Sequence, residues 1–170
     1  LWIGTSNGLN CYYGSGNKIY RNVLNDKYSL GNNFVGSLME EGEDLWIGTS
    51  SGLYIYDRSD DHFLYFDKTT KYGVFISCEV KKIVKTKNGL IWIATLGQGI
   101  FIYDPAKDVL TQNSIRTFFA WDICQGTDSL VYVSSMQEGL LCFDEEGTFL
   151  QNYPVSSELS IGNQRINCLH

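Results

Sequence analysis

Histidine and proline are scarce in this sequence, with 2 of each among 170 residues. His62 lies in a polar turn beside Asp60 and Asp61, and His170 is the last residue. Neither histidine has a nucleophile nearby, and no G-x-S-x-G, H-E-x-x-H or phosphate-loop motif is present. The sequence therefore predicts no catalytic residue and no cofactor. Paired acid and base carboxylates from distant turns remain an open alternative, because a fold brings separated residues together.

Metal-binding patterns are also lacking. The 5 cysteines form no C-x-x-C pair and match no zinc spacing. We interpret them as small buried side chains within predicted strands: Cys11, Cys78, Cys124, Cys142 and Cys168. Asp57, Asp60 and Asp61 form an acidic turn, but the order of calcium ligands in an EF-hand and its central glycine are missing. We therefore predict no metal site.

An excess of basic charge and a long apolar run are absent as well. The net charge is −6, which argues against nucleic acid and anionic membrane as partners, because both select basic surfaces. No segment approaches the roughly 18 consecutive apolar residues of a membrane span, so we expect no direct membrane contact from this segment.

A repeated phrase dominates what is present. Leu-Trp-Ile-Gly-Thr, followed within a few residues by Gly-Leu, begins at Leu1 and again at Leu45, and variants of it begin at Ile91 and Val131. Its anchor residues lie 44, 46 and 40 residues apart: Trp2, Trp46, Trp92 and Tyr132. A period of about 40–50 residues is typical of a four-stranded propeller blade.

Each repeat reads as four short strands joined by turns. In the second repeat the predicted strands are Val35–Met39, Leu45–Thr49, Leu53–Tyr56 and Phe63–Phe66. Their apolar runs are nearly continuous, which predicts strands buried on both faces, as in a blade between two others. We predict an all-β propeller segment over residues 1–170 with four blade equivalents, almost no helix and no second domain. We also expect Trp46 and Trp92 to pack between blades. A two-sheet sandwich is the structural alternative.

These residues resemble the two-component regulator propeller repeat. The likeness rests on the Leu-Trp-Ile-Gly-Thr phrase, on the aromatic-aspartate end Tyr56-Asp57, and on the run Ser29–Val35, which recurs at Ser160–Ile166. It covers essentially the whole chain. It is weakest at Tyr132, where the tryptophan is absent and Ser134 replaces the glycine.

The resemblance implies a periplasmic sensor region of a hybrid two-component histidine kinase. It implies larger rings, an adjoining immunoglobulin-like domain, a membrane helix and a kinase, so the remaining blades and downstream domains of a receptor are expected partners. It also implies an oligosaccharide as the signal. We therefore expect a fragment of a larger propeller. Two alternatives stay open, a polysaccharide-active lyase or hydrolase and a scaffold that binds proteins.

Loops that enter first strands, and turns that join second to third strands, share one face of a propeller. Exposed aromatic, amide and charged side chains there suit the recognition of a sugar or a peptide. We predict these ligand-binding residues: Tyr28, Asn33, Tyr72, Gln98, Arg116, Gln137 and Arg165.

The strand phase makes a prediction about assembly. The sequence begins at a second strand and ends in a first strand, so pairing of Arg165–Leu169 with Leu1–Thr5 would close a four-bladed ring. The family resemblance implies larger rings instead. We therefore expect self-association, with two copies forming a homodimer that completes one ring.

Overall fold

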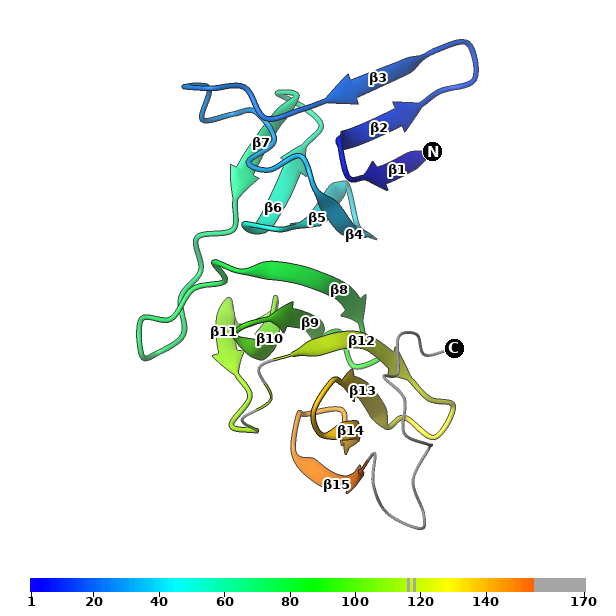
Figure 1. Cartoon of the computed structure of the whole chain (residues 1–170), viewed down its shortest axis with the longest axis vertical. Coiled ribbons are helices and arrows are strands. Elements are labelled where there is room, and N and C mark those ends of the chain that lie inside the picture. The colour runs from blue at the N-terminus through cyan, green and yellow to red at the C-terminus, as the bar shows by residue number, and fades with distance from the viewer. Residues whose placement is uncertain (116, 118, 155–170) are drawn as a thin grey trace. The chain divides into compact units, whose positions relative to one another are not determined.

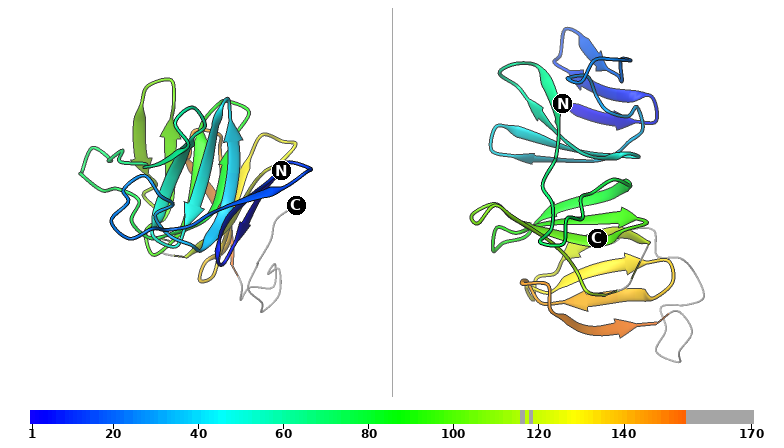
Figure 2. Two further views of the ribbon diagram at one scale, coloured as in Figure 1. Left: turned by 90° about the horizontal axis from the view of Figure 1, so that it is seen from above. Right: turned by 90° about the vertical axis from the view of Figure 1, so that its left-hand side faces the viewer.

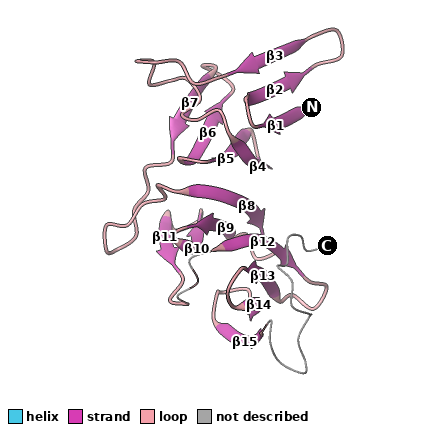
Figure 3. Cartoon of the chain, viewed as in Figure 1, coloured by secondary structure: helices cyan, strands magenta, loops and turns pink. Residues whose placement is uncertain are grey.

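The structure is a computed structural model that describes residues 1–115, 117 and 119–154. Strands make up the regular structure of this part of the chain, and none of these residues is helical (Figure 3). The strands are β1 (Trp2–Thr5), β2 (Gly8–Tyr12), β3 (Asn17–Tyr20), β4 (Val35–Glu41), β5 (Asp44–Thr49), β6 (Gly52–Asp57), β7 (His62–Tyr65), β8 (Glu79–Lys85), β9 (Ile91–Leu96), β10 (Gly99–Asp104), β11 (Val109–Gln112), β12 (Ala120–Gln125), β13 (Val131–Ser135), β14 (Gly139–Phe143) and β15 (Phe149–Tyr153).

Each repeat forms one antiparallel meander, as predicted (Figure 1). The first sheet has three strands, β1–β3. The other three sheets have four each: β4–β7, β8–β11 and β12–β15. The four strands predicted in the second repeat match β4–β7 to within two residues at each end. The predicted first strand at Ile166–Leu169, and its pairing with Leu1–Thr5, lie outside the described residues.

The chain divides into two compact units. The first holds Leu1–Asp67 and Ile76–Val80, and the second holds Lys68–Phe75 and the described residues from Lys81 onward. Each unit contains its own pair of neighbouring sheets, whose strands are seen along two further directions in Figure 2.

The core of the first unit lies between its two sheets. Leu9, Leu45 and Ile47 belong to one buried cluster, and Trp2 packs against it. The Trp2 ring contacts that of Tyr56 edge-on, with centroids 5.2 Å apart. The first tryptophan of the repeat therefore packs against the following blade.

The second unit repeats this arrangement. Trp92 is fully buried, and it shares a cluster with Val133, Leu141 and Phe143 of the next sheet. The rings of Trp92 and Phe143 lie 5.6 Å apart. The expected packing of Trp92 between blades is confirmed. Trp46 is also buried and its ring contacts that of Phe66.

The cysteine prediction is only partly right. Cys142 is buried, but Cys11, Cys78 and Cys124 are partly exposed. Cys78 also lies just before β8 rather than within a strand. Cys168 lies outside the described residues.

Candidate ligand-binding site

The turns between second and third strands have a common construction. The threonine of the repeated phrase donates its hydroxyl to the carbonyl of the glycine that follows the turn: Thr5 to Gly8, Thr49 to Gly52 and Thr95 to Gly99, at 2.8, 2.9 and 2.7 Å. These glycines have positive φ, which side chains disfavour. The repeated Thr and Gly therefore shape the turns that carry Gln98 and its equivalents.

The fourth repeat departs from this construction. Ser135 replaces the threonine and donates its hydroxyl to the Glu138 carboxylate instead. Thr117 donates to the same carboxylate at 2.8 Å. The β13–β14 turn is thereby tied to the segment that precedes β12.

The second unit contains a cleft along its outermost strand, which we call the edge cleft. Its volume is about 490 Å³. One wall is Thr70–Tyr72 and the other is Val109–Ser114, which comprises β11 and the two residues after it. The Tyr72 ring is 82% exposed, and Lys71 lies over it with its Nζ 5.0 Å from the ring centroid.

A tight turn holds Tyr72 in place. The hydroxyl of Thr70 accepts hydrogen bonds from the backbone N–H groups of Tyr72 and Val74, at 3.3 and 3.2 Å. The backbone N–H of Thr70 in turn donates to the Val74 carbonyl at 2.7 Å. The exposed ring is therefore presented by an ordered backbone.

A second hollow adjoins the edge cleft, and we call it the amide hollow. It has a volume of about 330 Å³. Its lining residues are Gly97, Gln98, Gln112, Asn113, Ser114, Ile115 and Thr117. Gln112, Asn113 and Ser114 line both hollows and so form the boundary between them.

Amide side chains fix the shape of this boundary. Gln112 Nε2 donates to the Gln98 carbonyl at 2.7 Å, and Gln98 Nε2 donates to the Phe75 carbonyl at 3.0 Å. Asn113 Nδ2 donates to the Gly147 carbonyl at 2.8 Å. Amide groups both donate and accept hydrogen bonds, so they match the hydroxyl groups of a sugar or the backbone of a peptide.

Charge is sparse along these hollows. Lys71 is the charged residue among the described lining residues, and no carboxylate lines either hollow. At one end of β11, Lys68 pairs with Asp108 at 2.6 Å, and this contact lowers the pKa of the Asp108 carboxyl. Burial and the hydrogen bond to Asp108 raise the pKa of Tyr103 to about 12. The lining therefore suits a ligand that is neutral or negatively charged.

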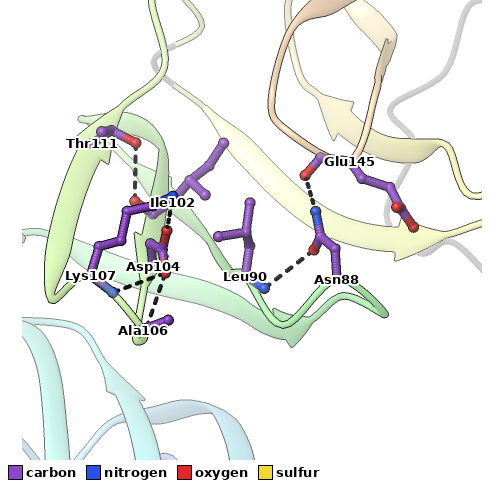
Figure 4. A network of polar contacts seen from close by, with 8 residues as sticks. All are labelled: Asn88, Leu90, Ile102, Asp104, Ala106, Lys107, Thr111 and Glu145. Carbon is purple, nitrogen blue, oxygen red and sulfur yellow. Dashed lines mark hydrogen bonds and ion pairs between the residues drawn. The ribbon is translucent and has the colours of Figure 1, made fainter.

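Asp104, the last residue of β10, stabilises the β10–β11 turn (Figure 4). Asp104 Oδ1 accepts from the N–H groups of Ala106 and Lys107, and its Oδ2 pairs with Lys107 Nζ at 2.7 Å. The figure also shows Asn88 Nδ2 donating to the Glu145 carbonyl at 3.0 Å. Asp57 and Asp144 cap their turns in the same way. The turn that leads into β11 is therefore fixed by hydrogen bonds and an ion pair.

The structure separates the predicted ligand-binding residues. Tyr72 lines the edge cleft and Gln98 lines the amide hollow. Gln137 is exposed in the β13–β14 turn and lines neither hollow. Arg116 and Arg165 lie outside the described residues.

Tyr28 and Asn33 belong to the first unit and do not meet. The Asn33 carbonyl accepts from Gly8 N–H at 2.7 Å, which places it at the β1–β2 turn, as expected. Tyr28 instead stacks on His62, at the start of β7, with centroids 4.3 Å apart. The connection between β3 and β4 follows the edge of β7, so Tyr28 does not lie beside Asn33 at the β1–β2 turn.

Several lining residues escaped sequence reasoning. The loops that enter the first strands of the third and fourth repeats were predicted to lie on the binding face, but these of their residues were not chosen individually: Thr70, Lys71, Gln112, Asn113 and Ser114. The available signal was the pair of amides, Gln112-Asn113, at the end of an apolar strand. Two further hollows, of about 500 and 670 Å³, lie in the first unit and contain none of the predicted residues.

Metal and membrane features were sought in the same described residues. No group of three or more His, Cys, Asp or Glu side chains there is arranged to hold a metal ion. None of the described segments forms a helix long and apolar enough to span a membrane.

Comparison with known proteins identifies which solved structures share this fold. No protein-family model and no curated protein matches the chain. Among solved structures, the extracellular domain of the hybrid two-component system BT4673 from B. thetaiotaomicron aligns with a TM-score of 0.74 and 21% identity, over 88% of this chain and 23% of that chain. The corresponding domain of BT3049 from the same organism aligns with a TM-score of 0.51 and 19% identity, over 94% of this chain and 27% of that one.

An enzyme shares the architecture as well. Virginiamycin B lyase from Staphylococcus aureus aligns with a TM-score of 0.55 and 11% identity, over 72% of this chain and 42% of that chain. The chain thus spans about a quarter of the BT4673 domain that it matches. The likeness inferred from the repeats is confirmed for the fold: the chain is built of consecutive β-propeller blades and resembles the extracellular domains of hybrid two-component systems.

Proposed function

We propose that this chain is part of the extracytoplasmic sensor of a two-component receptor, and that it binds an oligosaccharide without chemically changing it. The observation that carries the proposal is the amide hollow, where Gln98, Gln112 and Asn113 converge beside an exposed tyrosine. Fold alone does not determine function, so the proposal rests on this site together with the resemblance to extracellular sensor domains.

The amide hollow suits a sugar for a physical reason. A sugar presents several hydroxyl groups that donate and accept at once, and amides offer both functions at fixed positions. An aromatic ring adds apolar contact for the face of a pyranose. Gln98 is held from both ends by Phe75 and Gln112, so its position is set before a ligand arrives.

Calorimetric titration of the chain with a panel of oligosaccharides tests the proposal. We expect a Gln98→Ala variant to bind the preferred sugar about fivefold more weakly, because a lost polar contact of this kind is worth about 1 kcal/mol. Gln137→Ala is the matched control, since Gln137 also lies in a strand-connecting turn but lines neither hollow. Equal weakening by both changes would contradict the assignment of the site.

The two alternatives give different outcomes. A lyase or hydrolase would convert the bound oligosaccharide to smaller products, which chromatography of the incubated sugar detects. A scaffold would bind no sugar in the panel. We expect the sugar to be recovered unchanged.

A further inference from the structure

Strand β11 presents an open edge. It is the last strand of its sheet, in the order β11-β10-β9-β8. Asn113 N–H donates to the Ile100 carbonyl at 2.8 Å. In an antiparallel pair, the residues that face the partner strand alternate with residues that face away. Val109, Thr111 and Asn113 therefore point their backbone groups at β10, whereas Leu110 and Gln112 point theirs outward.

The corresponding edge in the first unit is occupied. Phe63 of β7 pairs with Tyr56, as Leu110 of β11 pairs with Tyr103, so Phe63 and Leu110 hold the same position in their repeats. Phe63 N–H points outward and donates to the Tyr28 carbonyl at 2.9 Å. A turn of the connection between β3 and β4 thus covers the outward N–H of Phe63.

The edge of β11 has no such cover within the described part of the chain. The connection that could supply one folds into the tight Thr70–Val74 turn instead, and the edge cleft of about 490 Å³ lies between that turn and β11. No described residue bonds to the outward N–H groups of Leu110 and Gln112. Because neighbouring strands lie about 4.8 Å apart, this edge can accept one further extended backbone.

We propose that the edge cleft binds an extended segment of a partner polypeptide, which adds to β11 as a further strand. The inference goes beyond the proposed sensor function and stands independently of it. Leu110 and Gln112 supply two N–H donors and two carbonyl acceptors, the pattern by which exposed sheet edges bind peptides. Alternate side chains of the segment then lie against Tyr72 and Lys71, and against Val109, which is 46% exposed.

The charge of the cleft indicates which peptide sequences it would bind. Lys71 is the charged lining residue of the cleft among those described, and no carboxylate lines it. An acidic or neutral segment therefore matches the cleft better than a basic one. Proline at a pairing position of the segment is excluded, because it has no N–H to donate.

A pair of variants at one position isolates the backbone contact. Gln112→Ala and Gln112→Pro both remove the amide side chain, but the proline change also removes the outward N–H. Proline is tolerated on a free edge, since that N–H has no partner within the sheet. A random 12-residue peptide display library selected on the full 170-residue chain supplies the probes, and calorimetry measures their binding.

We expect selected peptides to bind the Gln112→Pro variant at least tenfold more weakly than the Gln112→Ala variant, because the two differ in the outward N–H and not in the lost amide side chain. Hydrogen exchange of the Leu110 and Gln112 amides should slow when peptide binds. Circular dichroism and thermal melting check the folding of the proline variant. If that variant is unfolded, a peptide N-methylated at alternate residues, tested on the wild-type chain, measures the same contact.

Three results would overturn the proposal. The first is equal binding of the selected peptides to the alanine and proline variants. The second is the failure of selection to enrich any peptide that slows exchange at Leu110 and Gln112. The third is an oligosaccharide that occupies the cleft and binds the two variants equally, which would assign the cleft to sugar.

Discussion

At the scale of the residue, Trp92 shows what the repeated tryptophan does. It is fully buried among side chains of the next sheet and contacts the Phe143 ring. We expect Trp92→Ala to lower the free energy of unfolding by about 3–5 kcal/mol, because the cavity adds to the lost transfer energy. Urea denaturation measures the change. Trp92→Phe keeps a ring against Phe143 and should cost less, so equal losses in both variants would argue against ring packing as the cause.

Asp61 makes a second prediction at this scale. Its carboxylate pairs with Lys18 at 2.5 Å and accepts hydrogen bonds from the hydroxyls of Tyr56 and Tyr20, at 2.7 and 2.8 Å. The bond to Lys18 is the largest of the causes that lower the pKa of Asp61 to about 2. A carboxyl with a lowered pKa stabilises the fold above its unfolded pKa of about 4, and that stabilisation is lost as the pH falls toward 2.

The measurement compares melting temperatures of the wild-type chain and Asp61→Asn between pH 2 and pH 7. Asparagine accepts the positive φ of 58° at this position, so the change removes charge without straining the backbone. We expect a difference that is constant above about pH 5 and disappears near pH 2. A difference that persists unchanged at pH 2 would mean that the charge is not responsible.

At the scale of the element, the glycine of the repeated phrase lies close against a valine side chain. A Cβ added at Gly48 would lie 2.6 Å from Val80 Cγ1, and one at Gly4 would lie 2.7 Å from Val35 Cγ1. Ala94 in the third repeat corresponds to Gly48, and Ala120 in the fourth repeat corresponds to Val80. These two alanines belong to one core cluster. A larger residue on one strand is thus matched by a smaller one on the other.

This size match predicts a compensating pair of changes. Gly48→Ala alone should destabilise the fold by about 1–3 kcal/mol, as overpacking does. Val80→Ala alone should also destabilise it, because Val80 is buried. We expect the double variant to lose clearly less than the sum of the two, which a double-mutant cycle of unfolding free energies measures. Additive losses would show that the two side chains do not compete for one space.

Strands were more predictable from the sequence than the site. The strands of the second repeat follow from apolar runs bounded by glycine and aspartate, because those residues determine turns locally. The bulges at Gly36 and Trp121, where one residue of the first strand is left unpaired, carry no comparable signal. The hollows depend on how loops distant in sequence meet. The Gln98–Phe75 and Gln112–Gln98 hydrogen bonds join such loops, and no local pattern indicates them. Exposed side-chain type was enough to select Tyr72 and Gln98, but not Gln112 and Asn113.

At the scale of the whole molecule, one sheet face makes a prediction about association. Ile3, Tyr12 and Ile19 lie on the same face of the first sheet, and each is more than 40% exposed. The residues that correspond to Ile3 in the second and fourth repeats, Ile47 and Val133, are fully buried. An exposed apolar face of this kind favours association between chains.

Sedimentation velocity over a range of concentrations tests this prediction. We expect the chain to self-associate, and we expect Ile3→Asp to shift it toward the monomer, because the charge would have to be buried in the contact. Leu24→Asp, at an 86% exposed residue of the connection between β3 and β4, controls for added charge. A wild-type chain that stays monomeric at every concentration would rule out association through this face.

The contact between aspartate, tyrosine and lysine occurs in two of the repeats. Asp61 and Asp108 occupy the same repeat position, and a tyrosine hydroxyl bonds to each. Their lysines do not correspond: Lys18 precedes Tyr20 by two residues, whereas Lys68 follows Phe66, the counterpart of Tyr20, by two. The aspartate and its tyrosine therefore recur at one position of the repeat, whereas the lysine comes from a different position in each case. The backbone around this aspartate thus lets a lysine reach the carboxylate from more than one position of the preceding blade.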